Sequence, residues 1–213
     1  MNVSPDSRQH WEALYAAKQP HEMSWTQPVP ATSLAFIQAL ALPRHAPILD
    51  VGGGDSRLVD FLLADGYQDL TVLDISGRAL ANVRQRLGAA GQAVHWLEAD
   101  IRTVEPDRRY ALWHDRAAFH FLINPAEVGR YLETARQALL PGGYLVLGAF
   151  ALDGPGRCSG LPVRQYNEAS LTAQMPAGFA RLRCQSAVHT TPFDTNQPFV
   201  FCAFRRLDEP LAS

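Results

Sequence analysis

The feature that most constrains this sequence is a regular alternation of short apolar runs and amphipathic segments between residues 46 and 151. The runs have the length of buried strands, and the segments between them carry apolar residues at helical spacing. The five runs cover residues 46–52, 69–75, 93–97, 110–114 and 144–151. This alternation predicts an α/β fold in which a mostly parallel sheet has helices on both faces.

Local signals predict where the helices of this region begin and end. Ser76 is a suitable N-cap for the helix that follows the second strand. Asn124 followed by Pro125 and an acidic residue is a strong helix start. The Pro-Gly-Gly at 141–143 is expected to end that helix and lead into the fifth strand.

The segments outside this region predict additional elements. Helices are expected at 8–18 and 31–41, a long loop at 153–165, a short helix near 167–175, and an antiparallel hairpin from strands 179–190 and 197–206. With 213 residues, 47% hydrophobic and 19% charged, we expect one domain with a substantial core. The net charge of −2, without a basic cluster, argues against a nucleic-acid partner.

The three cysteines match neither a disulfide framework nor a metal knuckle. We expect Cys158, Cys184 and Cys202 to be free thiols in a reducing compartment. The polar N-terminus shows no signal peptide, and no apolar stretch approaches the roughly 18 residues of a membrane span. The sequence therefore predicts a cytoplasmic protein without membrane contact.

Glycines and carboxylates gather where the predicted strands end. Gly52, Gly53 and Gly54 follow Asp50 at the junction of the first strand with its helix, where backbone can pass close to a ligand. Asp74 lies 20 residues beyond Gly54 and can accept hydrogen bonds from both hydroxyls of a ribose. Two further carboxylates follow the third and fourth strands, Asp100, which can accept from an adenine amine, and Asp115. Ligands of open α/β sheets bind at this edge.

These segments resemble the class I S-adenosylmethionine-dependent methyltransferases. The matching motifs are ILDVGGGDS at 48–56, LTVLDIS at 70–76, LEADI at 97–101 and LLPGGYLVL at 139–147. The resemblance implies a Rossmann-like sandwich with strand order 3-2-1-4-5-7-6 and an antiparallel strand 7. It also implies S-adenosyl-L-methionine as the cofactor and S-adenosyl-L-homocysteine as its product. No metal is expected, because the sequence shows no cluster of Asp and Asn ligands. The cofactor-binding residues that the resemblance implies are Trp25, Asp50, Gly52, Gly53, Gly54, Asp74, Ile75, Asp100, Ile101 and Asp115.

A finer resemblance is to the branch with the elongation-factor and citrate-synthase lysine methyltransferases. It rests on GYQDLTVLDIS at 66–76 and on an N-terminal region with Trp11 and Trp25. That branch favours an aspartate where this chain has His120. The candidate catalytic residues are Asp115 and His120, since an amine acceptor must lose a proton before it attacks. The candidate substrate-binding residues are Tyr15, Arg116, Phe119, Arg157, Arg164 and Tyr166.

We therefore expect a single methyltransferase domain over 1–213 with three parts: an N-terminal helical lid segment 8–42, a cofactor-binding core 43–151, and an acceptor-side loop, helix and hairpin 152–213. The expected acceptor is a small molecule or a protein side chain, methylated on N or O. Two alternatives remain open. A nicotinamide-dependent oxidoreductase could use the same sheet, although Arg57 stands where its third glycine is needed. A catalytically silent regulatory module would bind the cofactor only.

Overall fold

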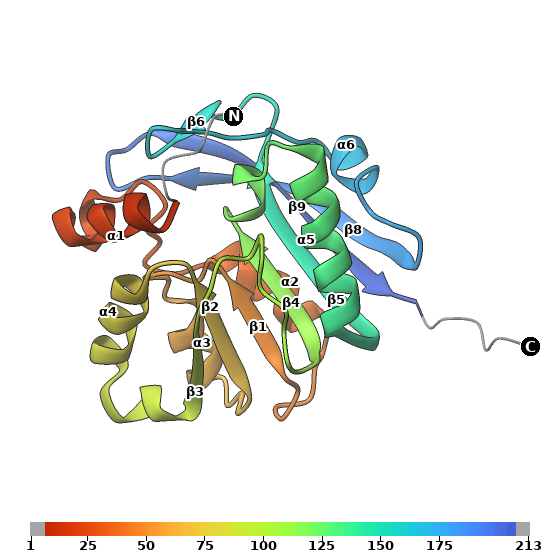
Figure 1. Ribbon diagram of the computed structural model, residues 1–213, viewed down its shortest axis with the longest axis horizontal. Coiled ribbons are helices and arrows are strands. Elements are labelled where there is room, and N and C mark those ends of the chain that lie inside the picture. Colours follow the sequence, from red (N-terminus) through yellow and green to blue (C-terminus); the bar gives the residue numbers. More distant parts are fainter. Residues whose placement is uncertain (1–6, 208–213) are drawn as a thin grey trace, which may run out of the picture.

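The computed structural model describes residues 7–207 and contains one seven-stranded sheet in the order β3-β2-β1-β4-β5-β9-β8 (Figure 1). Its strands are β1 Ile48–Val51, β2 Leu70–Asp74, β3 Val94–Glu98, β4 Tyr110–Arg116, β5 Leu139–Phe150, β8 Phe179–Thr190 and β9 Asn196–Arg206. Strands β1 to β5 run parallel, and β9 is antiparallel to both of its neighbours. A short separate hairpin is formed by β6 Arg157–Cys158 and β7 Leu161–Pro162. When this hairpin is left out of the count, the strand order is the predicted one, with the seventh strand antiparallel.

The helices lie close to their predicted positions. They are α1 Ser7–Ala17, α2 Ala31–Ala39, α3 Leu58–Ala64, α4 Gly77–Leu87, α5 Pro125–Ala138 and α6 Glu168–Thr172, with short 3-10 turns at Pro20–Glu22, Gly88–Ala93 and Phe119–Phe121. Both predicted caps are confirmed. The Ser76 hydroxyl accepts from the amide of Ala79 at 3.1 Å, and the Asn124 side chain accepts from the amide of Ala126 at 2.9 Å.

Alternation along the strands separates two apolar cores, one on each face of the sheet. Ile48 and Leu112 point to the face covered by α2, α3 and α4. Leu49 and Trp113 point to the other face, where α5 packs in front of β4 and β5 in Figure 1. The same alternation decides which polar side chains at the strand ends can share a site.

Two boundaries differ from the expectation. Strand β5 begins at Leu139, directly after α5, so the segment 141–143 lies inside the strand as an irregularity, with Gly142 at φ +73°. The loop expected at 153–165 contains the short hairpin of β6 Arg157–Cys158 and β7 Leu161–Pro162.

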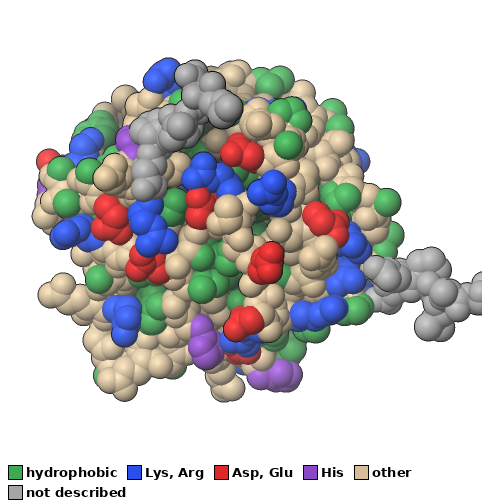
Figure 2. Space-filling model, in the orientation of Figure 1, with side chains coloured by type: hydrophobic (Ala, Val, Ile, Leu, Met, Phe, Trp, Pro, Cys, Tyr) green, Lys and Arg blue, Asp and Glu red, His purple; other side chains and the backbone are tan. Residues whose placement is uncertain are grey.

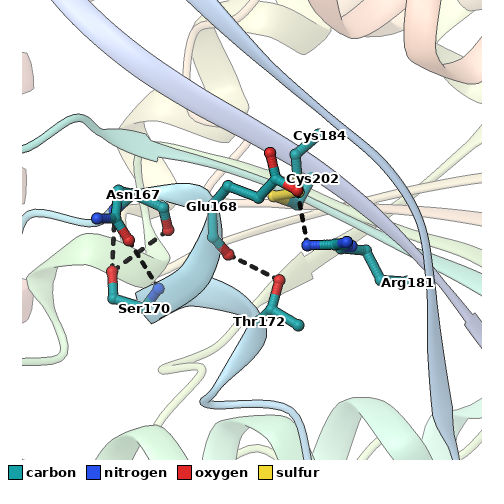
Figure 3. The surroundings of a disulfide bond; sticks show 7 residues. All are labelled: Asn167, Glu168, Ser170, Thr172, Arg181, Cys184 and Cys202. Atoms are coloured by element: carbon teal, nitrogen blue, oxygen red, sulfur yellow. Dashed lines mark hydrogen bonds and ion pairs between the residues drawn. A yellow bond between two sulfur atoms is a disulfide. The ribbon is translucent and has the colours of Figure 1, made fainter.

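The expectation of three free thiols is wrong for two cysteines. Cys184 and Cys202 form a disulfide between β8 and β9, and Figure 3 shows it beside α6. The two residues are directly opposed in the hairpin register, which brings their side chains together. An ion pair of 2.6 Å between Arg181 and Glu168 joins β8 to α6 nearby. Cys158 is a free, buried thiol, so cysteine usage no longer argues for a reducing compartment.

The surface gives two further findings. On the face shown in Figure 2, basic and acidic side chains are interspersed. Among residues 7–207, no helix combines the length and the apolar character that a membrane crossing needs.

Candidate functional site

A cleft with a volume of about 260 Å³ opens at the carboxyl ends of β1, β2 and β4. Its wall contains most of the residues predicted to bind the cofactor: Trp25, Asp50, Gly52, Gly53, Asp74, Ile75, Asp100 and Ile101. Gly54 lies beside it, against Tyr15 and Asp74. The structure thus brings together the motifs of four separate segments.

The glycine loop is shaped by close contacts. Gly52 has φ +62°, and a Cβ there would lie 2.6 Å from the Cβ of Ala118. Gly54 has φ +44°, and a Cβ there would lie 2.4 Å from the Tyr15 hydroxyl. Both positions therefore need glycine for conformation as well as for space. Arg86 on α4 fixes the following turn by donating to the Ser56 carbonyl at 2.6 Å.

Asp74 presents a buried carboxylate to the cleft. Its Oδ1 accepts from the Ser76 amide at 2.9 Å, and the Gly54 amide also donates to it. Burial raises the pKa of Asp74 to about 7, against 3.8 for an unperturbed aspartate. No described cation forms an ion pair with it. A carboxylate held this way is suited to accept hydrogen bonds from ligand hydroxyls.

Asp100 is held by a neighbouring arginine. Both the Nε and the amide of Arg102 donate to its Oδ1 at 2.9 Å. Burial raises the pKa of Asp100, but the bonds from Arg102 outweigh burial and the net pKa is lowered. The carboxylate is therefore charged and fixed at the end of β3, where its remaining lone pairs can accept from an amine.

Aromatic side chains of the N-terminal segment cover the cleft. The Trp25 ring packs edge-on against Trp11, with centroids 5.8 Å apart, and against Tyr15 at 6.1 Å. Burial, and then the nearby Asp74, raise the pKa of the Tyr15 hydroxyl, which therefore stays protonated. Helix α1 is tied to α4 by a bond of 3.2 Å from the Arg78 amide to Glu12.

Asp115, predicted for both catalysis and cofactor binding, is not on the cleft wall. Its side chain points to the α5 face, as Trp113 does, and is fully buried. The carboxylate accepts from the amides of Ala118 and Phe119 at 3.0 Å and from the Tyr131 hydroxyl at 2.6 Å. The Asp115 carboxylate thus holds the turn after β4 in place from the α5 face of the sheet.

His120, the second predicted catalytic residue, is also buried away from the cleft. Its imidazole stacks on Phe150 with centroids 4.5 Å apart and accepts from the Phe150 amide at 3.4 Å. Burial, and then the positive charge of Arg116, lower the pKa of His120 to about 3, so the ring is neutral. Phe119 lies in the core beside Tyr131.

The predicted substrate-binding residues divide in two groups. Tyr15 and Arg116 line the cleft, whereas Arg157, Arg164 and Tyr166 do not. Arg157 is exposed and bonds to the carbonyl of Gly160 in its own hairpin. Arg164 packs over the ring of the buried Tyr166.

A buried hydrogen-bonded chain in the cleft was missed by the sequence prediction. The Nδ1 of His114 lies 2.7 Å from Asp50, and its Nε2 lies 2.9 Å from the Ser33 hydroxyl. Asp50 and His114 are direct partners across the parallel pair β1 and β4, so both face α2, which carries Ser33. All three residues line the cleft. Strand alternation could have revealed this, because His114 follows Leu112 on the same face.

Comparisons with known proteins agree with this geometry. Residues 48–143 match the family model of a methyltransferase domain. No curated protein matches the sequence.

Solved structures resemble the chain over nearly its whole length. The N-methyltransferase NodS from Bradyrhizobium japonicum, in complex with S-adenosylhomocysteine, has a TM-score of 0.72 at 16% identity, covering 96% of this chain and 100% of NodS. The Burkholderia thailandensis 1,6-didemethyltoxoflavin-N1-methyltransferase has a TM-score of 0.68 at 20% identity, covering 95% and 84%. A protein studied for the conversion of a disulfide into a thioacetal in echinomycin biosynthesis has a TM-score of 0.76 at 18% identity, covering 94% and 93%.

The described chain has the Rossmann-like fold of the class I methyltransferases. Residues 48–143, which match the methyltransferase domain, contain strands β1 to β4 and the helices between them. In the described part of the chain, no group of three or more His, Cys, Asp or Glu side chains is placed to hold a metal ion.

Proposed function

We propose that this protein binds S-adenosylmethionine in the cleft and transfers its methyl group to a nitrogen or oxygen atom of a small molecule or protein side chain. The observation that carries the proposal is the buried carboxylate of Asp74, which lies against the glycine loop and has no cation as a partner among the described residues. It occurs in a chain whose residues 48–143 match a methyltransferase domain. The bound cofactor supplies an electrophilic methyl group. The chain supplies the alignment and the dry cleft that such a displacement needs.

Each side chain on the wall has a distinct role in this proposal. Asp74 accepts from the ribose hydroxyls, and Asp100 with Ile101 holds the adenine. Gly52 and Gly53 allow the backbone to approach the methionine part. Trp25 presents its ring near the positive sulfonium, which an aromatic face stabilises.

Three observations bear on the acceptor atom and on the kind of molecule that carries it. The similar NodS and toxoflavin-pathway proteins are N-methyltransferases, which favours nitrogen as the acceptor atom. The motifs shared with the lysine methyltransferase branch favour a protein amine. The flat rings of Trp25 and Phe121 on the cleft wall instead suit a small aromatic molecule.

Two experiments test the proposal. Calorimetry should show binding of S-adenosylmethionine and S-adenosylhomocysteine, and none of NAD. The proposal would be wrong if NAD bound at micromolar concentration and neither adenosyl compound bound. Incubation with methyl-labelled cofactor and a fractionated lysate then shows whether proteins or metabolites take the label. Cofactor binding without any labelled acceptor would favour a silent regulatory module.

A further inference from the structure

Arg116, at the end of β4, is a cation on the cleft wall that is only partly used. Its guanidinium packs over the Phe199 ring at 5.0 Å, and Nη1 donates to the carbonyl of Trp25 at 3.0 Å. The Nη2 atom is buried and has no hydrogen-bond acceptor within residues 7–207. The side chain is thus held in place with donor capacity to spare.

The surroundings of Arg116 do not neutralise its charge. It forms no ion pair within the described residues. Two acidic groups act on its charge: first Cys158, whose buried thiol has a raised pKa, and then Asp50, which is already bonded to His114. Burial lowers the pKa of Arg116 to about 10, so the guanidinium remains charged at neutral pH. A largely buried charge without an ion-pair partner is costly, and an anionic ligand that paired with Arg116 would offset this cost.

The two histidines near Arg116 carry no charge themselves. His189 on β8 lies 2.6 Å from the Ser24 carbonyl through Nε2 and 3.4 Å from the Gln27 amide nitrogen through Nδ1. Burial and the charge of Arg116 lower its pKa, as they do for His120. Both rings are therefore neutral, and the positive charge stays uncompensated.

The cleft wall that holds Arg116 also carries apolar and aromatic side chains, together with the polar Ser33, Asp50 and His114. Trp25 and Phe121 bring flat rings from the N-terminal loop and from the turn after β4, and Leu161 and Pro162 come from the short hairpin. A ligand that fills this part of the cleft must combine flat apolar surface with one group that pairs with a guanidinium.

We propose that the methyl acceptor carries an oxyanion, a carboxylate or a phosphate, on a flat apolar body, and that Arg116 binds this oxyanion. This inference rests on the proposed methyltransferase function and names the substrate class of the same cleft. A guanidinium recognises both kinds of oxyanion through charge-assisted hydrogen bonds. The anion would also offset the charge of the neighbouring sulfonium.

The test uses small aromatic probes on the full-length protein saturated with S-adenosylhomocysteine. Calorimetry compares benzoate, phenyl phosphate and the neutral benzamide. We expect at least one of the two anions to bind at least tenfold more tightly than benzamide, and the tighter anion identifies the oxyanion. Equal binding of all three, or binding of none, would overturn the inference, whereas the proposed function fails only if S-adenosylhomocysteine itself does not bind.

Variants locate the effect. Arg116→Met should abolish the preference for the anion, and Arg116→Lys should keep part of it. Arg44→Met is a matched control, because Arg44 also packs on an aromatic ring, at 4.5 Å from the centroid of Tyr67, but lies outside the cleft. Thermal melting checks that each variant is folded. An unchanged preference in a folded Arg116→Met protein contradicts the inference.

One rival role is tested in the same series, since the cofactor has a carboxylate of its own. Were Arg116 to bind that carboxylate, Arg116→Met would weaken S-adenosylhomocysteine but not 5′-methylthioadenosine, which lacks the amino-acid part. That outcome also overturns the inference. We expect both compounds to bind the variant within threefold of the wild type.

Discussion

The Tyr131 hydroxyl donates a hydrogen bond of 2.6 Å to the buried carboxylate of Asp115. The same hydroxyl accepts from Trp113 Nε1 at 2.8 Å, so it connects α5 to β4 at two points. Tyr131→Phe leaves the carboxylate short of a donor and the indole without its acceptor. We expect a loss of about 1–3 kcal/mol in the free energy of unfolding, measured with urea at pH 8.

The destabilisation caused by Tyr131→Phe should depend on pH, because it acts on the charged form of Asp115. Burial raises the pKa of Asp115 to about 6, above the 3.8 of an unperturbed aspartate, so the folded state holds this proton more tightly and folding becomes less favourable as pH rises between these values. The lost bond stabilised the charged form, so the effect of Tyr131→Phe should be larger at pH 8 than at pH 5. Tyr166→Phe is the control, because the buried Tyr166 hydroxyl has no partner among residues 7–207. Equal losses for both variants contradict the assignment.

Asp115 also shows what the sequence could and could not predict. The alternation of strands and helices, the caps at Ser76 and Asn124, and the carboxylates at the strand ends are local patterns, and the structure confirms where they lie. Which strand-end side chains share a face depends on a one-residue alternation. Asp115 and His114 are adjacent in sequence but point to opposite faces, so the prediction chose the residue that faces the core.

Asp74 is expected to lower the stability of the ligand-free protein and to strengthen the binding of S-adenosylhomocysteine. Its pKa of about 7 means that the ligand-free folded protein carries an unfavourable buried charge above that pH. Asp74→Asn should therefore raise the melting temperature of the ligand-free protein at pH 8, with a smaller gain at pH 5, where the folded carboxyl is protonated. Asp74→Ala should weaken the binding of S-adenosylhomocysteine by roughly 1.5–3 kcal/mol in total. Asp74→Asn should weaken it less, because an amide oxygen still accepts one hydrogen bond.

The control for Asp74 is Asp153→Asn, at an exposed carboxylate outside the cleft. It should change neither the melting temperature nor the calorimetric affinity. Wild-type affinity in Asp74→Ala would show that this carboxylate does not bind the ligand.

The Ser33–His114–Asp50 chain should behave as a coupled unit. His114→Leu leaves the buried Asp50 side chain without its hydrogen-bond partner, which costs about 1–3 kcal/mol. Ser33→Ala removes only the outer hydroxyl and should cost about 1 kcal/mol. Urea unfolding of His114→Leu, Asp50→Asn and the double variant measures the coupling. Strictly additive losses would mean that the two side chains do not stabilise each other.

The disulfide between Cys184 and Cys202 joins residues separated by 18 positions. A cross-link of this span restricts the unfolded chain and stabilises by about 3 kcal/mol. Dithiothreitol should therefore lower the melting temperature of the wild type. The paired variant Cys184→Ser with Cys202→Ser should melt at the lower temperature with or without the reductant. Cys158→Ser, at the free thiol, should keep the response to dithiothreitol, and its loss there would be inconsistent with this pairing.

The N-terminal segment 8–30 should act as a lid over the cleft. Trp11, Tyr15 and Trp25 lie on the cleft wall, while the described bonds that tie α1 to the body include surface pairs such as Arg8 with Glu98. Exposed ion pairs contribute little to stability, so the main contact that such a movement must break is the packing of Tyr15 against Ala79 of α4. Figure 1 shows α1 at the edge of the molecule above α4, where such a movement would not disturb the sheet.

Hydrogen exchange tests the lid directly. A segment that closes over a ligand belongs to the less stable part of a fold and gains protection when the ligand binds. Residues 10–30 should therefore exchange more slowly after addition of S-adenosylhomocysteine, whereas the amides of α5 beyond Glu127, where the helix packs on the sheet and does not line the cleft, should change little. Trp25→Ala should reduce both this protection and the methyl transfer to whichever acceptor takes the label. Equal protection with and without ligand, together with wild-type transfer by Trp25→Ala, would leave the segment with a packing role alone.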